Sequence, residues 1–341
     1  MGHTFHIPVL GLGFSVDTPL KVAKFGISSV ASIVDDMLIE RMRKYHAEKR
    51  GEVFIPIELK EHDSRAKRIT AYLNLIDKLV REDFEILRSS PFEPLSDITR
   101  YFDLLPETSA LKLKYKQMLL VSDPNLKAMI QDVLRQDITP GSIDVNIMSK
   151  VDKLNLSANN EPLAEEYSDA LAALRGFAQS NLRSSVVLSA GMNPRLYSYL
   201  ENFTCFLPDE NGRIDKKVIL KVSDFRSAFI QAKFLAKKGL WVSEFRIESG
   251  LNCGGHAFAT DGFLLGPILE EFKLRRTEMI QELYSLYQPA LLSKAVNIQS
   301  VPDMRISVQG GIGTAEENSF LMDYYQMDAT GWGSPFLLVP E

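Results

Sequence analysis

Short apolar runs alternate with helical patterns near the start of the chain. Residues 5–14 and 28–34 are rich in aliphatic and β-branched side chains, which is typical of strands that are buried on both faces. Between them, Asp17 or Thr18 can cap a short helix that carries Pro19 in its first turn. This strand–helix–strand order with short connections predicts a parallel α/β fold.

Six further runs of the same kind follow in the second part of the chain. Residues 223–238 carry apolar side chains at helical spacing, and Gly239 follows as a stop signal, so a helix is expected between two of these strands. Eight strands with intervening helices favour a closed (β/α)8 TIM barrel over an open sheet. The six runs are residues 142–148, 184–190, 217–222, 242–247, 305–308 and the last strand within 330–336.

The alternation stops between the second and third predicted strands. Residues 66–87 and 111–134 have helical spacing, and residues 40–140 contain no convincing strand. We interpret 40–140 as a helical insertion that forms a cap or a subunit contact, and residues 1–39 and 141–341 as the barrel domain. Subtracting a typical barrel of about 250 residues leaves about 90, close to the size of this insertion.

A basic cluster, Arg65, Lys67 and Arg68, lies beside His62 and Asp63 in the predicted insertion. One interpretation is an ordinary solvated helix face. The other is a positive patch that guides an anionic substrate toward the site.

Composition and charge exclude several classes of protein. A net charge of −5 argues against a nucleic-acid partner, because that binding needs clustered cations. Cys205 and Cys253 are the only cysteines, so a disulfide framework, a zinc site and an iron–sulfur cluster are not expected, and no metal is predicted. No apolar run reaches the roughly 18 residues that span a bilayer. We therefore expect a cytoplasmic protein that neither spans nor binds a membrane.

Glycines follow the seventh predicted strand. Gly310 and Gly311 let the backbone approach a ligand closely, and the helix that begins at Thr314 adds a partial positive charge, so this segment is a candidate anion cradle. The other interpretation is a tight turn in which Thr314 and Glu317 form a capping box.

A second glycine segment changes the balance between these interpretations. Gly333 and Ser334 come at the end of the eighth predicted strand. In TIM barrels the loops after strands seven and eight often bind a phosphate together. The two segments together therefore predict a phosphate site.

Three motifs carry a resemblance to a known group of enzymes. Gly-Gly-Ile-Gly-Thr at 310–314, followed by a helix and Ala-Thr-Gly-Trp-Gly-Ser-Pro-Phe-Leu at 329–337, resembles the carboxyl-terminal part of the nitronate monooxygenase and enoyl reductase group of FMN-dependent barrels. The strand at 217–222 and the Gly-Gly-His at 254–256 are similar to that group's fifth strand and Gly-Gly-His segment. Asp-Val-Asn-Ile-Met at 144–148 is similar to its Gly-Val-Asn-Leu strand.

This resemblance implies FMN as cofactor. Asn146 and Lys221 would lie near the flavin ring or the ribityl chain, and a cation near N1 and C2 would stabilise the reduced, anionic ring. A lysine that ends an apolar strand can otherwise simply reach solvent. The phosphate-binding and Gly-Gly-His positions that the resemblance implies are Gly254, Gly255, Gly310, Gly311, Gly333 and Ser334.

His256 is the candidate catalytic residue. An unperturbed imidazole titrates near neutral pH, and the matching histidine of the group that the chain resembles removes a proton from the substrate. The alternative is a histidine that is hydrogen-bonded within a loop. Cys253 nearby is either a reactive thiol or a small buried residue. Residues 10–15 depart from the group's Gln-Ala-Pro-Met, which implies different flavin contacts and a different substrate.

We therefore expect an FMN-dependent oxidoreductase that acts on a small organic substrate, nitronate monooxygenase-like or enoyl reductase-like. A homo-oligomer formed through the helical insertion is also expected. Two alternatives stay open: a flavin-free TIM-barrel lyase or isomerase that acts on a phosphorylated substrate, and a non-catalytic barrel that works through a partner.

Overall fold

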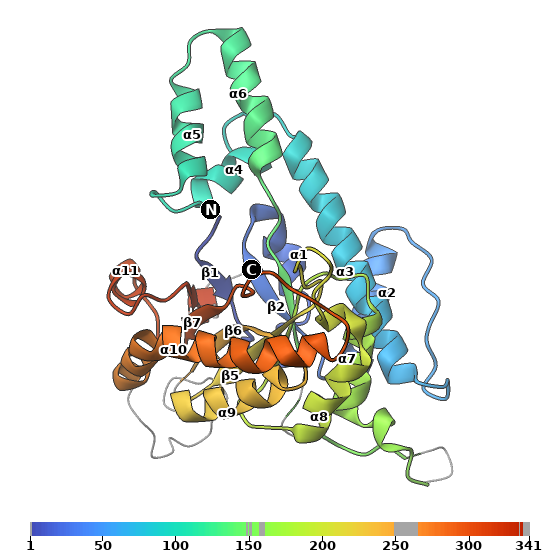
Figure 1. Cartoon of the computed structure of the whole chain (residues 1–341). Coiled ribbons are helices and arrows are strands. Elements are labelled where there is room, and N and C mark those ends of the chain that lie inside the picture. The colour runs from blue at the N-terminus through green and yellow to red at the C-terminus, as the bar shows by residue number, and fades with distance from the viewer. Residues whose placement is uncertain are drawn as a thin grey trace.

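The barrel predicted from the sequence is present. The computed structural model describes residues 2–147, 149, 152–156, 161–248, 265–333, 335 and 336. Eight parallel strands pair in chain order, and β1 pairs with β8 to close the sheet, with helices around it (Figure 1). The strands are β1 (Phe5–Ile7), β2 (Ser28–Ser32), β3 (Ile143–Asn146), β4 (Ser185–Leu188), β5 (Lys217–Val222), β6 (Val242–Ile247), β7 (Arg305–Gln309) and β8 (Ala329–Gly331).

Helices separate the strands, and α2 to α6 all lie between β2 and β3, where the insertion was predicted. In the part of the chain that the structure describes, no helix is both long and apolar enough to cross a membrane. The α-helices are α1 (Thr18–Val22), α2 (Asp36–Lys49), α3 (Ser64–Ser89), α4 (Asp97–Leu104), α5 (Ala110–Leu119), α6 (Pro124–Asp137), α7 (Asp169–Gln179), α8 (Pro194–Tyr199), α9 (Phe225–Ala236), α10 (Leu265–Leu292) and α11 (Ala315–Asp323). Short 3-10 helices are η1 (Ala23–Phe25), η2 (Glu165–Tyr167), η3 (Leu200–Asn202) and η4 (Thr204–Phe206).

The first strand is shorter than predicted. β1 ends at Ile7, and the apolar run continues into a loop in which the Ser15 hydroxyl accepts a hydrogen bond from the Leu10 amide at 2.7 Å. Val9 packs against a cluster of barrel side chains, and Leu10 packs against a second cluster outside the barrel. The run is apolar because the loop packs against both clusters, not because it is extended.

The stretch of helical spacing over 111–134 contains two helices. α5 ends at Leu119, and α6 begins at Pro124 after a cap in which the Asp123 carboxylate accepts from the Asn125 amide at 2.9 Å. Proline has no N–H to continue a preceding helix, and it disfavours helical backbone in the residue before it. The spacing of apolar residues alone does not reveal this break between the two helices.

Helix α3 covers part of the barrel. Ile69, Tyr72 and Leu73 are buried in the same core as Val145 of β3. The helix contacts α7 so closely that a Cβ added to Gly176 would lie 2.7 Å from the Ile69 Cγ2 atom. This helix therefore belongs to the layer that packs on the sheet.

Helices α4, α5 and α6 form a second core at the amino-terminal end of the strands. The rings of Phe102 and Tyr115 stack with centroids 4.7 Å apart, and they share a cluster with Phe25 and Ile27, which precede β2. In Figure 1, α5 and α6 stand together away from the barrel. The insertion is thus anchored at the end of the barrel opposite to the predicted cofactor loops.

The basic cluster of the insertion is neutralised internally. Arg65 and Arg68 both bind the Asp36 carboxylate at 2.6 Å, and the Arg68 side chain is only 1% exposed. Lys67 lies 3.3 Å from a Glu61 carboxylate oxygen. The two arginines thus hold α3 to the first turn of α2. The cluster is therefore neither a free patch that could guide a substrate nor an entirely solvated helix face.

Candidate functional site

The described members of the predicted site lie at the carboxyl ends of the strands. Asn146 ends β3, Lys221 lies one residue before the end of β5, and Gly310 and Gly311 follow β7 directly. Active sites of TIM barrels lie at this end. Gly333, which follows β8, is also described. The remaining members, Cys253, Gly254, Gly255, His256 and Ser334, lie outside the described residues.

The loops after β7 and β8 are adjacent. The Gly310 amide donates to the Gly331 carbonyl at 3.4 Å. Gly310 has a φ of 91° and Gly311 a φ of 73°, backbone conformations that favour glycine because any other residue has a Cβ that clashes there. The chain can therefore turn sharply here with a bare backbone.

The start of α11 is occupied by a carboxylate of its own. The Thr314 hydroxyl accepts from the Glu317 amide at 3.2 Å, and a Glu317 carboxylate oxygen accepts from the amides of Gly313 at 2.8 Å and Thr314 at 3.0 Å. Hydrogen bonds from these two amides lower the pKa of Glu317. Of the two interpretations of this segment, the capping box is present, and it takes two amides that a phosphate cradle at the helix would need.

The inside of the barrel is strongly polar along β6 and β7. Glu244, Arg246 and Ser307 are buried there and bonded to one another. None of the three is among the site residues predicted from the sequence. The available signal was the strict alternation of polar and apolar residues over 244–248, Glu-Phe-Arg-Ile-Glu, which sends every second side chain to one face of a strand.

The central network pairs one arginine with two acids. The Arg246 Nη2 atom donates to Asp144 at 2.5 Å, and its Nε atom donates to Glu244 at 2.8 Å, while the Ser307 hydroxyl also donates to Glu244 at 2.6 Å. Burial by itself raises the pKa of Glu244, but the charge of Arg246 and the hydrogen bonds lower it to about 2. The same acids raise the pKa of Arg246 against the effect of burial. Glu244 and Arg246 are therefore both charged at neutral pH.

A second network leads from the centre to the carboxyl end. The Gln309 amide nitrogen donates to Glu248 at 2.7 Å, and the Lys221 ammonium lies 3.3 Å from the other oxygen of the same carboxylate. On its other side, the Gln309 carbonyl oxygen lies 3.4 Å from the His6 Nε2 atom. Gln309 thus connects His6 to the Glu248 carboxylate.

His6 is held as a neutral imidazole. The side chain is 4% exposed. Burial, followed by the charge of Arg246, lowers the pKa of His6 to about 3. A neutral histidine deep in the barrel is therefore connected through Gln309 to Glu248 and Lys221 at the carboxyl end.

The other side of the barrel interior is apolar. Val30, Val187 and Ile219, from β2, β4 and β5, form a cluster with Val9 of the loop after β1. Lys221 is two residues beyond Ile219 on the same strand and so lies on the same face. Its side chain is 21% exposed, and its ammonium lies beside Glu248 of the polar side.

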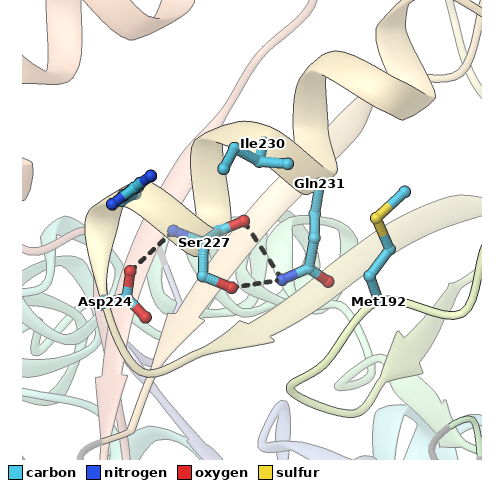
Figure 2. Close-up of a pocket in the computed structure, with 6 residues that line it drawn as sticks. Met192, Asp224, Ser227, Ile230 and Gln231 are labelled. Atoms are coloured by element: carbon cyan, nitrogen blue, oxygen red, sulfur yellow. Dashed lines mark hydrogen bonds between the residues drawn. The ribbon is translucent and has the colours of Figure 1, made fainter.

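A small surface pocket of about 340 Å³ lies at the start of α9 (Figure 2). The Asp224 carboxylate accepts from the Ser227 amide at 2.7 Å, and the Gln231 amide donates to the Ser227 hydroxyl at 3.0 Å. Met192 lines its edge. With an acidic cap already on the helix start, this pocket does not offer an anion site.

Metal and thiol chemistry have no support in the described part of the chain. Within residues 2–147, 161–248 and 265–333, no group of three His, Cys, Asp or Glu side chains is placed to hold a metal ion. Burial raises the pKa of the Cys205 thiol, so this cysteine is kept protonated and unreactive.

The comparisons with known proteins leave the classification at the level of the fold. No model of a protein family matches the chain, and no curated protein is significantly similar to it. The strand order and the closed sheet define a (β/α)8 TIM barrel, a fold that commonly carries enzymes.

Proposed function

We propose that this protein is an FMN-dependent oxidoreductase whose site lies at the carboxyl end of the barrel. The observation that carries the proposal is the pair of left-handed glycines, Gly310 and Gly311, of which Gly310 is bonded to the end of β8 at Gly331. Bare backbone at the ends of strands seven and eight is the arrangement with which TIM barrels hold a phosphate. The motif resemblance supplies the choice of FMN over other phosphate-bearing groups.

The described residues fit the phosphate end of FMN on the β7 and β8 side. A Cβ added at Gly333 would meet its nearest atom, Leu10 Cδ2, only at 3.7 Å, so the loop after β8 is not crowded there. The amides of Gly313 and Thr314 are held by Glu317 and do not contribute. The Gly310 amide is likewise bonded, to the Gly331 carbonyl, so the phosphate would depend on the backbone at Gly311 and at the loop after β8 and not on the start of α11.

Lys221 and Asn146 supply the polar groups on the ring side. FMN, when bound, would supply the hydride or electron exchange with a small organic substrate. The positive charge of Lys221 would favour the reduced, anionic ring, and Glu248 holds that charge in place at 3.3 Å. Asn146, which is 5% exposed, would contribute an amide that is already ordered by its position at the end of β3. His256 stays the proposed proton-transfer residue.

Flavin binding tests the proposal directly. The purified protein, incubated with FMN and freed of excess, should show the visible absorption of a bound flavin. Gly311→Ala should weaken FMN binding at least tenfold, because a Cβ would both strain the turn and occupy the cradle. Gly51→Ala is the matched control, since Gly51 has a similar φ of 70° and a Cβ there would meet nothing within 4 Å.

A second variant tests the ring side. Lys221→Met should lower the reduction potential of the bound flavin, because the cation that favours the anionic ring is lost. A colourless protein that takes up no added FMN contradicts the proposal. Binding of phosphorylated compounds without FMN uptake would instead support a flavin-free lyase or isomerase.

A further inference from the structure

A large polar cavity opens at the amino-terminal end of the barrel. It measures about 800 Å³ and is lined by the first residues of several strands, among them Lys217, Arg305 and Ala329. Its volume is in the range of small-molecule sites. This end of a TIM barrel ordinarily serves stability, so a cavity of this size and polarity needs another explanation.

The rim of the cavity carries more positive than negative groups that are free to meet a ligand. Arg183 and Arg213 share one acid, Asp215, each at 3.8 Å. Arg305 is half exposed and lies 3.9 Å from Glu244. Lys217 is exposed, and within the described part of the chain no ion pair to it is found. The further acids Asp303 and Asp328 line the cavity, and Asp328 is bound by Arg276 at 2.7 Å.

The floor of the cavity contains buried donors without acceptors. Arg246, 3% exposed, binds Asp144 and Glu244 through Nη2 and Nε, but its Nη1 atom has no partner. The hydroxyl of Ser184, a residue that is 8% exposed, also has none. Both residues line the cavity. Buried donors are nearly always satisfied in native proteins, so these two call for acceptor atoms from outside the chain.

We propose that this cavity binds a small oxyanion, a phosphorylated or carboxylated small molecule, separately from the proposed FMN site at the opposite end. Guanidinium groups match the geometry of phosphate and carboxylate oxygens. The hydroxyls of Ser28, Ser185 and Ser243 around the same wall add neutral donors for the ligand's other oxygens.

The charged rim attracts the anion, and the donors on the floor of the cavity bind its oxygen atoms. Arg246 is already balanced by Asp144 and Glu244, so it contributes a hydrogen bond rather than net charge. Lys217 and Arg213 contribute the charge that would draw an anion into the cavity. Removing these two should therefore weaken binding without disturbing the barrel interior.

Calorimetric titration of the full chain with inorganic phosphate and with citrate, at constant ionic strength, tests this proposal. The double variant Arg213→Gln/Lys217→Gln should bind the better of the two anions at least about tenfold more weakly than the wild type. The control Arg41→Gln/Lys60→Gln removes the same charge from two exposed residues that do not line the cavity, and it should bind like the wild type. Stronger binding of phosphate indicates a phosphorylated ligand, and stronger binding of citrate a carboxylated one.

Two results would overturn the proposal. One is the absence of saturable binding of either anion to the wild type, which would leave the cavity to water. The other is equal affinity in all three proteins, which would place the anion elsewhere, including the loops after β7 and β8. FMN uptake by the cavity variant should equal that of the wild type, so the two proposals fail or succeed independently.

Discussion

The buried His6 predicts a measurable loss of stability in mild acid. In the folded protein the pKa of this imidazole is lowered to about 3, by burial first and by the charge of Arg246 second. When the pH falls below the ordinary value of 6.5, the unfolded chain takes up a proton at this site and the folded chain does not. Stability is therefore lost as the pH falls from 6.5 toward 3, and at about pH 5 the loss is about 2 kcal/mol, from 1.5 pH units at roughly 1.36 kcal/mol each.

Equilibrium unfolding in urea isolates this contribution. The free energy of unfolding of the wild type and of His6→Gln is measured at about pH 8, pH 7 and pH 5. Lost packing shifts the variant equally at every pH, and the carboxylates titrate alike in both proteins, so only the change in their difference reports on His6. That difference should move by about 2 kcal/mol in favour of the variant between about pH 7 and pH 5, and hardly at all between about pH 8 and pH 7. A constant difference across the whole range would refute a buried, neutral His6.

Three further predictions concern packing and assembly. Lys216→Met should lower the free energy of unfolding by about 2–3 kcal/mol, because the ammonium donates to three carbonyls at and after the end of α7. In the same unfolding assay, the neighbouring control Lys217→Met should change it by less than about 0.5 kcal/mol. Gly331→Ala should destabilise the protein by about 1–3 kcal/mol, since the new Cβ would lie 2.5 Å from a β7 side chain. Gly333→Ala should be tolerated, because the nearest neighbour of its Cβ would be at 3.7 Å. Thermal melting compares the two variants. If the insertion is a subunit contact, Leu120→Glu, at a position 84% exposed, should lower the mass measured by light scattering, and an unchanged mass would speak against it.

Local patterns determined the order of the elements because their causes are local. β5 and β6 have the predicted bounds, and Gly26 and Gly239 end their helices with left-handed backbone, as glycine allows. The run at 5–14 was misassigned because an apolar loop that packs on a core has the same composition as a buried strand. An apolar composition predicts that a segment is buried, but it does not determine whether the buried backbone is a strand or a loop.

For the candidate site too, the sequence determined the local features and the tertiary structure determined the contacts between distant residues. The sequence by itself determined that Gly310 and Gly311 form a turn after a strand, and that Thr314 and Glu317 have the spacing of a capping box. Only the tertiary structure decided which network the polar positions of β6 join. Arg246 meets Asp144 across 102 residues of sequence, and the alternation along one strand cannot say whether its polar face points to solvent or into a closed barrel. The pairing of β1 with β8 closes the barrel and turns one face of every strand inward. A charged side chain on that face is buried, and it is stable there only when another inward-facing group pairs with it.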